Sequence, residues 1–302
     1  MEAALVIKAV GALGVLGLVA SGVLAIASRR FWVEVDPRVE QILSLLPGSN
    51  CGACGNPSCF ATAELIAQGE AAPSACIAGG QETADAIADL VGAERCEVAA
   101  LVVARACGGG TQAQRAFEYR GVPSCTAASR LAGGPLACQW GCLGYGDCVR
   151  ACPFGALRLD DRGLPVVDLA RCTGCGVCVQ TCPRGGTKLL WLVPEGSYVV
   201  VRCSAHSKPK DRKAACARCC IACKKCERVC PSDAIHVVDG VAVVAYGSCT
   251  ACGACVDACP QQCIDLYGRG RGVDAMAADG AGPAVGPRSS SMPGTDEPAE
   301  AS

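Results

Sequence analysis

The sequence predicts an α+β protein in three parts: one apolar N-terminal helix, a small helical domain, and two tandem domains of short helices and hairpins. Three observations support this. A charge-free stretch of 19 residues covers residues 9–27. A glycine-rich loop at residues 46–59 carries three cysteines and leads into a helical stretch. Further along, four cysteine quartets form an internal repeat of about 80 residues, and a hairpin signal follows the first and third quartets.

Cysteine dominates the composition. The 27 cysteines among 302 residues stand in tight clusters, unlike those of a short secreted disulfide scaffold. Clustered thiolates indicate bound metal. Only 3 Trp, 5 Tyr and 4 Phe are available for apolar cores, so bound cofactors are expected to organise much of the fold. The net charge of -1 and the lack of a long basic run argue against nucleic-acid binding.

The apolar stretch is long enough to span a bilayer. Arg29 and Arg30 follow it directly, whereas Glu2 precedes it. The positive-inside bias therefore predicts a transmembrane anchor at residues 1–30, with the N-terminus outside and the remaining chain on the cytoplasmic side of the membrane. Thiols stay reduced there. A cleaved signal peptide is the alternative, since residues 25–27 read Ala-Ile-Ala.

A second domain is expected at residues 31–92. Asp36 is a candidate helix cap and Pro37 a first helical residue. The loop that follows begins a Cys-x2-Cys-x4-Cys-x16-Cys pattern, whose glycines can turn backbone N–H groups toward cluster sulfides. This pattern predicts a [4Fe-4S] cluster, with zinc as the structural alternative. The predicted ligands are Cys51, Cys54, Cys59 and Cys76.

The remaining quartets are typical of bacterial-type 2[4Fe-4S] ferredoxin-like domains. In such domains three closely spaced cysteines hold one cluster, and the fourth, before a proline, ligates the neighbouring cluster. Disulfides are improbable in the cytoplasm, and zinc ribbons separate their cysteine pairs more widely. The predicted ligand sets are Cys138, Cys142, Cys148 and Cys182; Cys172, Cys175, Cys178 and Cys152; Cys220, Cys223, Cys226 and Cys259; and Cys249, Cys252, Cys255 and Cys230.

These motifs set the remaining domain boundaries. We expect a connecting region at 93–135, ferredoxin-like pairs at 136–193 and 216–267, a linker at 194–215, and a disordered tail at 268–302. Seven cysteines lie outside the motifs. Cys96, Cys219 and Cys263 are interpreted as buried free thiols, Cys107 and Cys125 as packing residues or a redox-active pair, and Cys203 and Cys216 as structural thiols rather than extra ligands.

Three segments carry a family resemblance: Asn50–Gly55, Leu131–Pro135 and the glycine-rich Cys142–Cys148 loop. From the anchor to about Leu266 the chain resembles the B subunit of the Rnf electron transport complex, in the long form with two ferredoxin pairs. The resemblance implies a membrane-bound, ion-translocating ferredoxin:NAD oxidoreductase, in which this subunit relays electrons through five [4Fe-4S] clusters. Ferredoxin and the other subunits of the complex would be its partners.

The chain shows no site for bond-making chemistry. No Gly-x-Gly-x-x-Gly follows a predicted strand and opens a helix, so nucleotide binding is not expected. Its part in a translocase would be electron transfer alone, with cluster potentials set by cysteine geometry, amide hydrogen bonds and exposure. Two alternatives stay open: an iron-sulfur subunit of a hydrogenase or formate dehydrogenase, and a structural zinc protein.

Overall fold

The computed structural model describes residues 2–31, 36–187, 189–196 and 198–268, apart from the side chains of residues 2–9, 111 and 187. The chain divides into two compact units, residues 1–100 and 101–302. The predicted tail at 268–302 lies outside the described residues except for Gly268.

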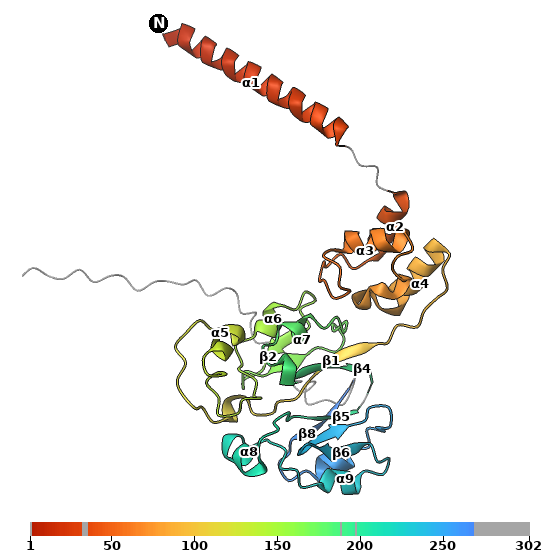
Figure 1. Ribbon diagram of the computed structural model, residues 1–302, viewed down its shortest axis with the longest axis vertical. Coiled ribbons are helices and arrows are strands. Elements are labelled where there is room, and N and C mark those ends of the chain that lie inside the picture. Colours follow the sequence, from red (N-terminus) through yellow and green to blue (C-terminus); the bar gives the residue numbers. More distant parts are fainter. Residues whose placement is uncertain (1, 32–35, 188, 197, 269–302) are drawn as a thin grey trace, which may run out of the picture. The chain divides into compact units, whose positions relative to one another are not determined.

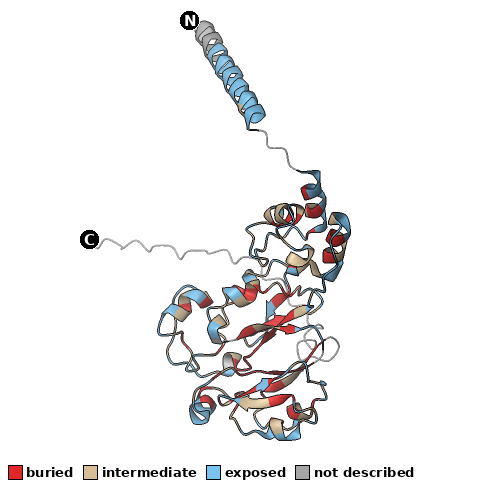
Figure 2. Cartoon of the chain, turned by 45° about the vertical axis from the view of Figure 1, so that its right-hand side comes forward, coloured by how far each residue is buried: buried red, intermediate tan, exposed pale blue. Residues whose placement is uncertain are grey.

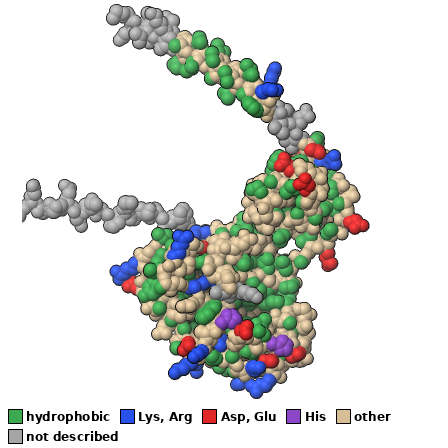
Figure 3. Space-filling model, in the orientation of Figure 1, with side chains coloured by type: hydrophobic (Ala, Val, Ile, Leu, Met, Phe, Trp, Pro, Cys, Tyr) green, Lys and Arg blue, Asp and Glu red, His purple; other side chains and the backbone are tan. Residues whose placement is uncertain are grey.

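The first unit opens with a long helix, α1 (Glu2–Arg30), seen in Figure 1. Its 29 residues rise about 44 Å at 1.5 Å each, more than the hydrocarbon thickness of a bilayer. In the described part of the chain, it is the one helix long and apolar enough to cross a membrane. An 18-residue window within Val10–Arg30 has a mean hydropathy of 2.3. Figure 3 shows its apolar side chains, with the basic Arg29 and Arg30 in its last turn.

Three further α-helices follow in the first unit: α2 (Pro37–Leu45), α3 (Cys59–Ala67) and α4 (Gly80–Val91). Two 3-10 turns, η1 (Pro73–Ala75) and η2 (Ile77–Gly79), separate the last two. Asp36 caps α2 by accepting the Arg38 N–H at 2.8 Å, as its sequence predicts. The helices enclose a small core of Val39, Ile42, Ala63, Ile66 and Ile87. This core holds the intervening cysteine loop in place.

The second unit begins with one repeat built from two antiparallel strand pairs. Strand β1 (Leu101–Arg105) pairs with β4 (Leu190–Pro194), and β2 (Leu157–Leu159) pairs with β3 (Pro165–Val167). The latter pair is the hairpin that the sequence predicts. Short helices α5 (Cys125–Arg130), α6 (Asp147–Arg150) and α7 (Val177–Thr181) and turns η3 (Gly110–Gln112) and η4 (Gly185–Thr187) complete this repeat.

The same plan recurs in the second repeat. Strand β5 (Tyr198–Val201) pairs with β8 (Ile264–Tyr267), and β6 (Ile235–Val238) forms the predicted hairpin with β7 (Val241–Val244). The helices are α8 (Pro209–Ala215), α9 (Lys225–Val229) and α10 (Ala254–Asp257). In Figure 2 the strands are mostly buried, as expected for elements that line a small core.

Direct contacts join the two repeats. The Tyr267 hydroxyl donates to the Val103 carbonyl, and Arg202 Nη1 donates to the Arg105 carbonyl at 3.1 Å. Cys107 and Cys203 also face each other in an isolated antiparallel bridge. Arg202 is only 1% exposed and forms an ion pair with Asp265 at 3.0 Å. The repeats therefore share a buried junction.

The opening strands lie in segments that were expected to be connections. Strand β1 falls within residues 93–135, and β5 falls within residues 194–215. Both are short apolar runs without a cysteine, so the cysteine motifs give no signal for them. Each of them pairs with the last strand of its repeat, β4 or β8.

Candidate iron-sulfur centres

The first centre lies in the helical unit. Cys51, Cys54, Cys59 and Cys76 line one cavity, which brings the four predicted thiols together. Three come from the loop and the start of α3, and the fourth precedes η2. The space inside is about 340 Å³, part of it open to solvent.

Two asparagines shape this loop. Asn50 has a positive φ of 46°, which asparagine tolerates better than most residues, and its Oδ1 accepts the Cys59 N–H at 2.8 Å. Asn56 Nδ2 donates to Thr62 Oγ1, which lies 3.2 Å from Cys54 Sγ. Burial opposes ionisation of Cys54, yet the hydrogen bonds from Thr62 and Asn56 outweigh it and lower its pKa. Both asparagines therefore support the thiols, a role that the cysteine spacing alone does not predict.

At the second site, three of the predicted thiols, Cys142, Cys148 and Cys182, line one cavity. Cys125 at the start of α5 lines the same cavity. Cys138 lines another cavity, described below. In this first motif the position between Cys142 and Cys148 is held by Tyr145, whereas the second repeat has Cys223 at the same spacing. The first motif thus has no cysteine between Cys142 and Cys148, and the cavity contains the thiol of Cys125 in addition.

Asp147 fixes the position of Cys125. Its carboxylate accepts the Cys125 N–H at 3.0 Å, the Thr126 N–H at 3.0 Å and the Ser124 hydroxyl at 2.9 Å. Burial disfavours the charged carboxylate, but these hydrogen bonds prevail and lower the pKa of Asp147. Because Asp147 precedes Cys148 in the chain, it ties helix α5 directly to the motif.

A third cavity brings together another predicted set of thiols. Cys152, Cys172, Cys175 and Cys178 line it. Burial, followed by the nearby thiols of Cys148 and Cys172, raises the pKa of Cys178 to about 12. The Ala156 N–H donates to Cys152 Sγ at 3.3 Å. Such amide–sulfur bonds are the contacts that stabilise cluster thiolates.

The fourth centre also contains its predicted thiols, Cys220, Cys223, Cys226 and Cys259. Cys219 and Cys263 line the same cavity. Cys263 Sγ lies 3.7 Å from Cys259 Sγ, and hydrogen bonding to Cys263 lowers the pKa of Cys220 to about 5 and that of Cys259 to about 6. The pKa of Cys263 is raised by the same two bonds. Cys263 thus lies beside two of the predicted ligands, a placement that the sequence pattern does not reveal.

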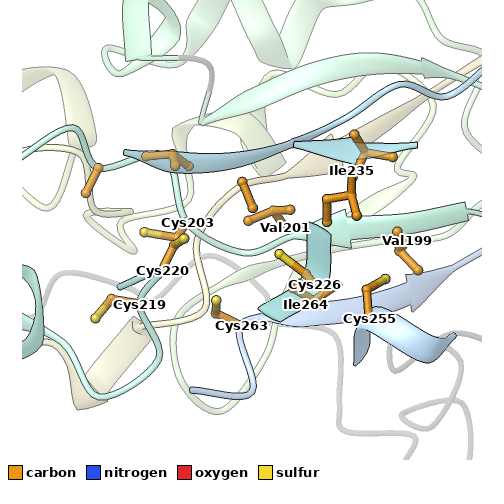
Figure 4. Close-up of a cluster of buried hydrophobic side chains, with 14 residues drawn as sticks. Val199, Val201, Cys203, Cys219, Cys220, Cys226, Ile235, Cys255, Cys263 and Ile264 are labelled. Carbon is orange, nitrogen blue, oxygen red and sulfur yellow. The ribbon is translucent and has the colours of Figure 1, made fainter. Parts of the chain in front are cut away.

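The fifth predicted centre gathers around Cys255 in α10. Burial, and then the neighbouring thiols of Cys226, Cys230 and Cys249, raise the pKa of Cys255 to about 12. Cys230 and Cys249 pack against the same buried cluster as Cys255. The Ala234 N–H donates to Cys230 Sγ at 3.3 Å, which repeats the Ala156–Cys152 contact of the first repeat. In Figure 4, Cys226 and Cys255 lie at one end of this cluster, and Cys203, Cys219 and Cys220 lie at the other.

Sulfur spacing distinguishes the possible metals. A tetrahedral zinc site with Zn–S bonds of about 2.3 Å holds its sulfurs about 3.8 Å apart. Among the described residues, no group of three or more His, Cys, Asp or Glu side chains has the spacing of a single-ion site. A [4Fe-4S] cube holds its thiolates further apart, because the core stands between them. Sulfur spacing is therefore the criterion that separates a cluster site from a single-ion site.

Comparisons with known families agree with this arrangement. An Fe-S cluster family model matches residues 46–78, and two 4Fe-4S dicluster models match residues 137–186 and 219–264. They confirm the predicted fold class: an apolar helix, an Fe-S domain and two ferredoxin-like domains. Both dicluster matches fall within the second unit.

Curated relatives cover most of the chain. The B subunit of an ion-translocating oxidoreductase complex from Methanosarcina acetivorans is 42% identical over 86% of this chain and 98% of its own length. The B subunit of a Na+-translocating ferredoxin:NAD+ oxidoreductase from Acetobacterium woodii is 42% identical over 84% and 76%. A proton-translocating counterpart from Clostridium ljungdahlii is 40% identical over 78% and 82%. The chain therefore belongs to the family of B subunits of the ion-translocating oxidoreductase complexes, the Rnf family.

Proposed function

We propose that this chain is the iron-sulfur electron relay of a membrane-bound, ion-translocating ferredoxin:NAD oxidoreductase. The main observation that supports this proposal is the set of thiol-lined sites in both units. We assign five [4Fe-4S] clusters to them. The ligand sets are Cys51, Cys54, Cys59 and Cys76; Cys125, Cys142, Cys148 and Cys182; Cys152, Cys172, Cys175 and Cys178; Cys220, Cys223, Cys226 and Cys259; and Cys230, Cys249, Cys252 and Cys255.

The chain contributes placement and electrostatics to this relay. A bound [4Fe-4S] cluster supplies one-electron oxidation and reduction. The thiols hold it, and amide N–H groups such as those of Ala156 and Ala234 stabilise the thiolates. We place the two ferredoxin-like domains at residues 101–194 and 198–267, so that each includes its opening strand.

Electron exchange with a soluble partner needs a site near the surface. Cys223 is exposed, and Lys224 and Lys225 line the same cavity. A positive rim steers an acidic redox protein toward such a site. Two of the relatives are named for ferredoxin, and we expect ferredoxin to exchange electrons with this chain at that edge.

The anchor gives the relay its place in the membrane. We propose that α1 spans the bilayer with Arg29 and Arg30 on the cytoplasmic side, where the cysteine-rich domains then lie. Residues 9–27 carry no charged side chain that could pass an ion. For this reason we assign ion translocation to partner subunits. Relatives of nearly equal identity are named for sodium and for protons.

The test is metal and sulfide analysis of the full-length protein, made in a host that assembles clusters and purified in detergent without oxygen. The five clusters predict at least about 20 iron and as much sulfide per chain. Reduced ferredoxin should bleach the cluster absorbance, and Lys224→Glu with Lys225→Glu should slow that step at low salt. Several zinc ions with almost no sulfide would overturn the proposal.

A further inference from the structure

A separate cavity at the junction of the two repeats contains thiols that the five clusters do not use. Its empty space is about 310 Å³, similar to the 320–380 Å³ of the three other thiol cavities in this unit. No single sequence motif marks it, because its cysteines come from distant segments. They are Cys107, Cys138, Cys203, Cys216 and Cys219.

Four of these thiols occupy equivalent positions in the two repeats. Cys107 follows the end of β1 by two residues, and Cys203 follows the end of β5 by two residues. Cys138 stands four residues before Cys142, and Cys216 stands four residues before Cys220. Each repeat therefore supplies the same two cysteines to one shared cavity. Such a pattern is expected for a site on a local two-fold axis.

The backbone holds these thiols around open space. Cys107 and Cys203 are direct partners in an antiparallel bridge, supported by the Gly108 N–H bond to the Arg202 carbonyl at 2.9 Å. A Cβ atom on Gly109 would lie 3.0 Å from Cys216 Sγ and 3.9 Å from Cys107 Sγ. Because Gly109 has no Cβ, the space beside both sulfurs stays open.

The charges around the cavity call for an anion. Arg202, Arg212 and Arg218 line it, and Arg202 and Arg218 both pair with Asp265 at 3.0 Å. Arg212 is 2% exposed and donates only to the carbonyls of Ala205 and Gly240, with no carboxylate partner among the described residues. A buried cation without a countercharge is costly. A [4Fe-4S] core with four thiolates carries two negative charges in its oxidised state and would balance this surplus.

Two residues that line this cavity also have buried polar atoms without a hydrogen-bond partner. In the described part of the chain, Arg212 Nε and Ser204 Oγ are buried without a hydrogen-bond partner, and both residues line the cavity. Buried donors of this kind are normally satisfied. Thiolate and sulfide sulfurs of a cluster can accept such hydrogen bonds, as they do in other iron-sulfur sites.

We propose that Cys107, Cys138, Cys203 and Cys216 bind a sixth [4Fe-4S] cluster that links the two ferredoxin-like repeats. This inference rests on the proposed electron-relay function and adds a centre to it. Because two ligands come from each repeat, the cluster lies at their junction and offers a path between the two cluster pairs. Cys219 lies in the wall of this cavity and of the neighbouring one, and is left as a thiol.

The first test is native mass spectrometry with iron analysis of the full-length, anaerobically purified protein. Six clusters predict about 24 iron per chain, and five predict about 20. A wild-type chain with five clusters and about 20 iron would overturn the sixth site while leaving the relay intact. This measurement requires no variant, so misfolding cannot obscure it.

Single substitutions then identify the ligands. Cys203→Ser and Cys216→Ser should each remove one cluster, or about 4 iron, and leave the other five in place. Cys219→Ser and Cys96→Ser are matched controls, since Cys219 shares the wall and Cys96 is exposed and far along the chain. Loss of a cluster in Cys219→Ser but not in Cys216→Ser would contradict the proposed ligand set.

Discussion

The Asp147 carboxylate accepts the backbone N–H of Cys125 at 3.0 Å, so a residue beside one thiol of the motif positions another thiol 22 residues earlier. The same carboxylate accepts bonds from Ser124 and Thr126 and pairs with Arg150. Helix α5 has only six residues and could not hold its own place. Asp147 therefore supplies an anchor that the helix lacks.

Replacing Asp147 with asparagine should loosen the centre that contains Cys125. The amide presents an N–H group where the carboxylate accepts two backbone N–H bonds, and a lost cap of this kind costs about 1 kcal/mol. We expect this cluster to bleach faster in air than in the wild type, measured by absorbance and by iron content. Asp161→Asn is the control, because Asp161 is exposed on the hairpin turn. Equal bleaching rates in all three proteins would contradict the anchoring role.

The substitution Cys125→Ser should remove the second centre, and a second change should restore it. Tyr145 stands where the other repeat has its middle cysteine, and its ring packs against Tyr119 at 5.7 Å between centroids. The double variant Cys125→Ser, Tyr145→Cys recreates the Cys-x2-Cys-x2-Cys spacing of residues 220–226. We expect the single variant to lose about 4 iron and the double variant to regain them.

The outcome separates the two assignments of the second centre. If Cys125→Ser keeps the full iron content while Cys138→Ser loses this cluster, then the ligand set predicted from sequence, with Cys138, is correct. Electron paramagnetic resonance after reduction distinguishes which centre has been lost, since each pair shows its own magnetic coupling.

Substituting Asn50 should weaken the first centre in two separable ways. Asn50→Ala removes the acceptor of the Cys59 N–H and also places alanine at a φ of 46°, which costs roughly 1–2 kcal/mol. Asn50→Gly removes the same hydrogen bond but tolerates the backbone conformation. We expect the alanine variant to lose its cluster faster than the glycine variant, and both to lose it faster than the wild type. Oxygen-exposure half-lives measure this order, and equal half-lives for all three would contradict it.

The substitution Gly109→Ala should exclude the sixth cluster without touching a thiol. The added Cβ would lie 3.0 Å from Cys216 Sγ and take up space that the cluster needs. We expect about 4 fewer iron per chain, with the other centres unchanged. Gly247→Ala is the matched control, because a Cβ added there would meet nothing within 4 Å and its φ is not positive. An unchanged cluster count in Gly109→Ala would contradict the geometry proposed for the site.

Removing the clusters should unfold the second unit. Its described strands form four two-stranded sheets, and an isolated strand pair is marginally stable in water. The cores between them contain cysteines such as Cys148, Cys178 and Cys226. Anaerobic chelation should therefore abolish hydrogen-exchange protection at the β5–β8 amides, while helix α1 in detergent keeps its protection. Persistent protection at β5–β8 in the iron-free protein would show that apolar packing alone suffices.

The sequence predicted what depends on local spacing. The cap at Asp36, the hairpins at β2–β3 and β6–β7, and the order of domains follow from short-range patterns of turn residues and cysteines. The grouping around Cys51 likewise needs only one loop and the helix after it. These features could be predicted because the residues that decide them lie close together in the chain.

What the sequence did not predict depends on long-range contacts. The place of Cys125 depends on a carboxylate 22 residues away, and the junction cavity joins Cys107 to Cys203 across 96 residues. Strands β1 and β5 carry no cysteine, so the motif pattern assigned them to connections. The sequence did contain one signal for the place of Cys125. Comparison of Cys142–Cys148 with Cys220–Cys226 shows that the first motif has Tyr145 where the other has Cys223.

The equivalent placement of Cys107 with Cys203, and of Cys138 with Cys216, bears on how such a chain can arise. A single repeat holds only half of the junction site, and it could complete the site only by associating with a second copy of itself. Fusing two copies in one chain makes that association intramolecular and replaces a dependence on protein concentration with a high effective concentration. Two halves joined in this way need not stay identical, and here Tyr145 stands in one half where Cys223 stands in the other.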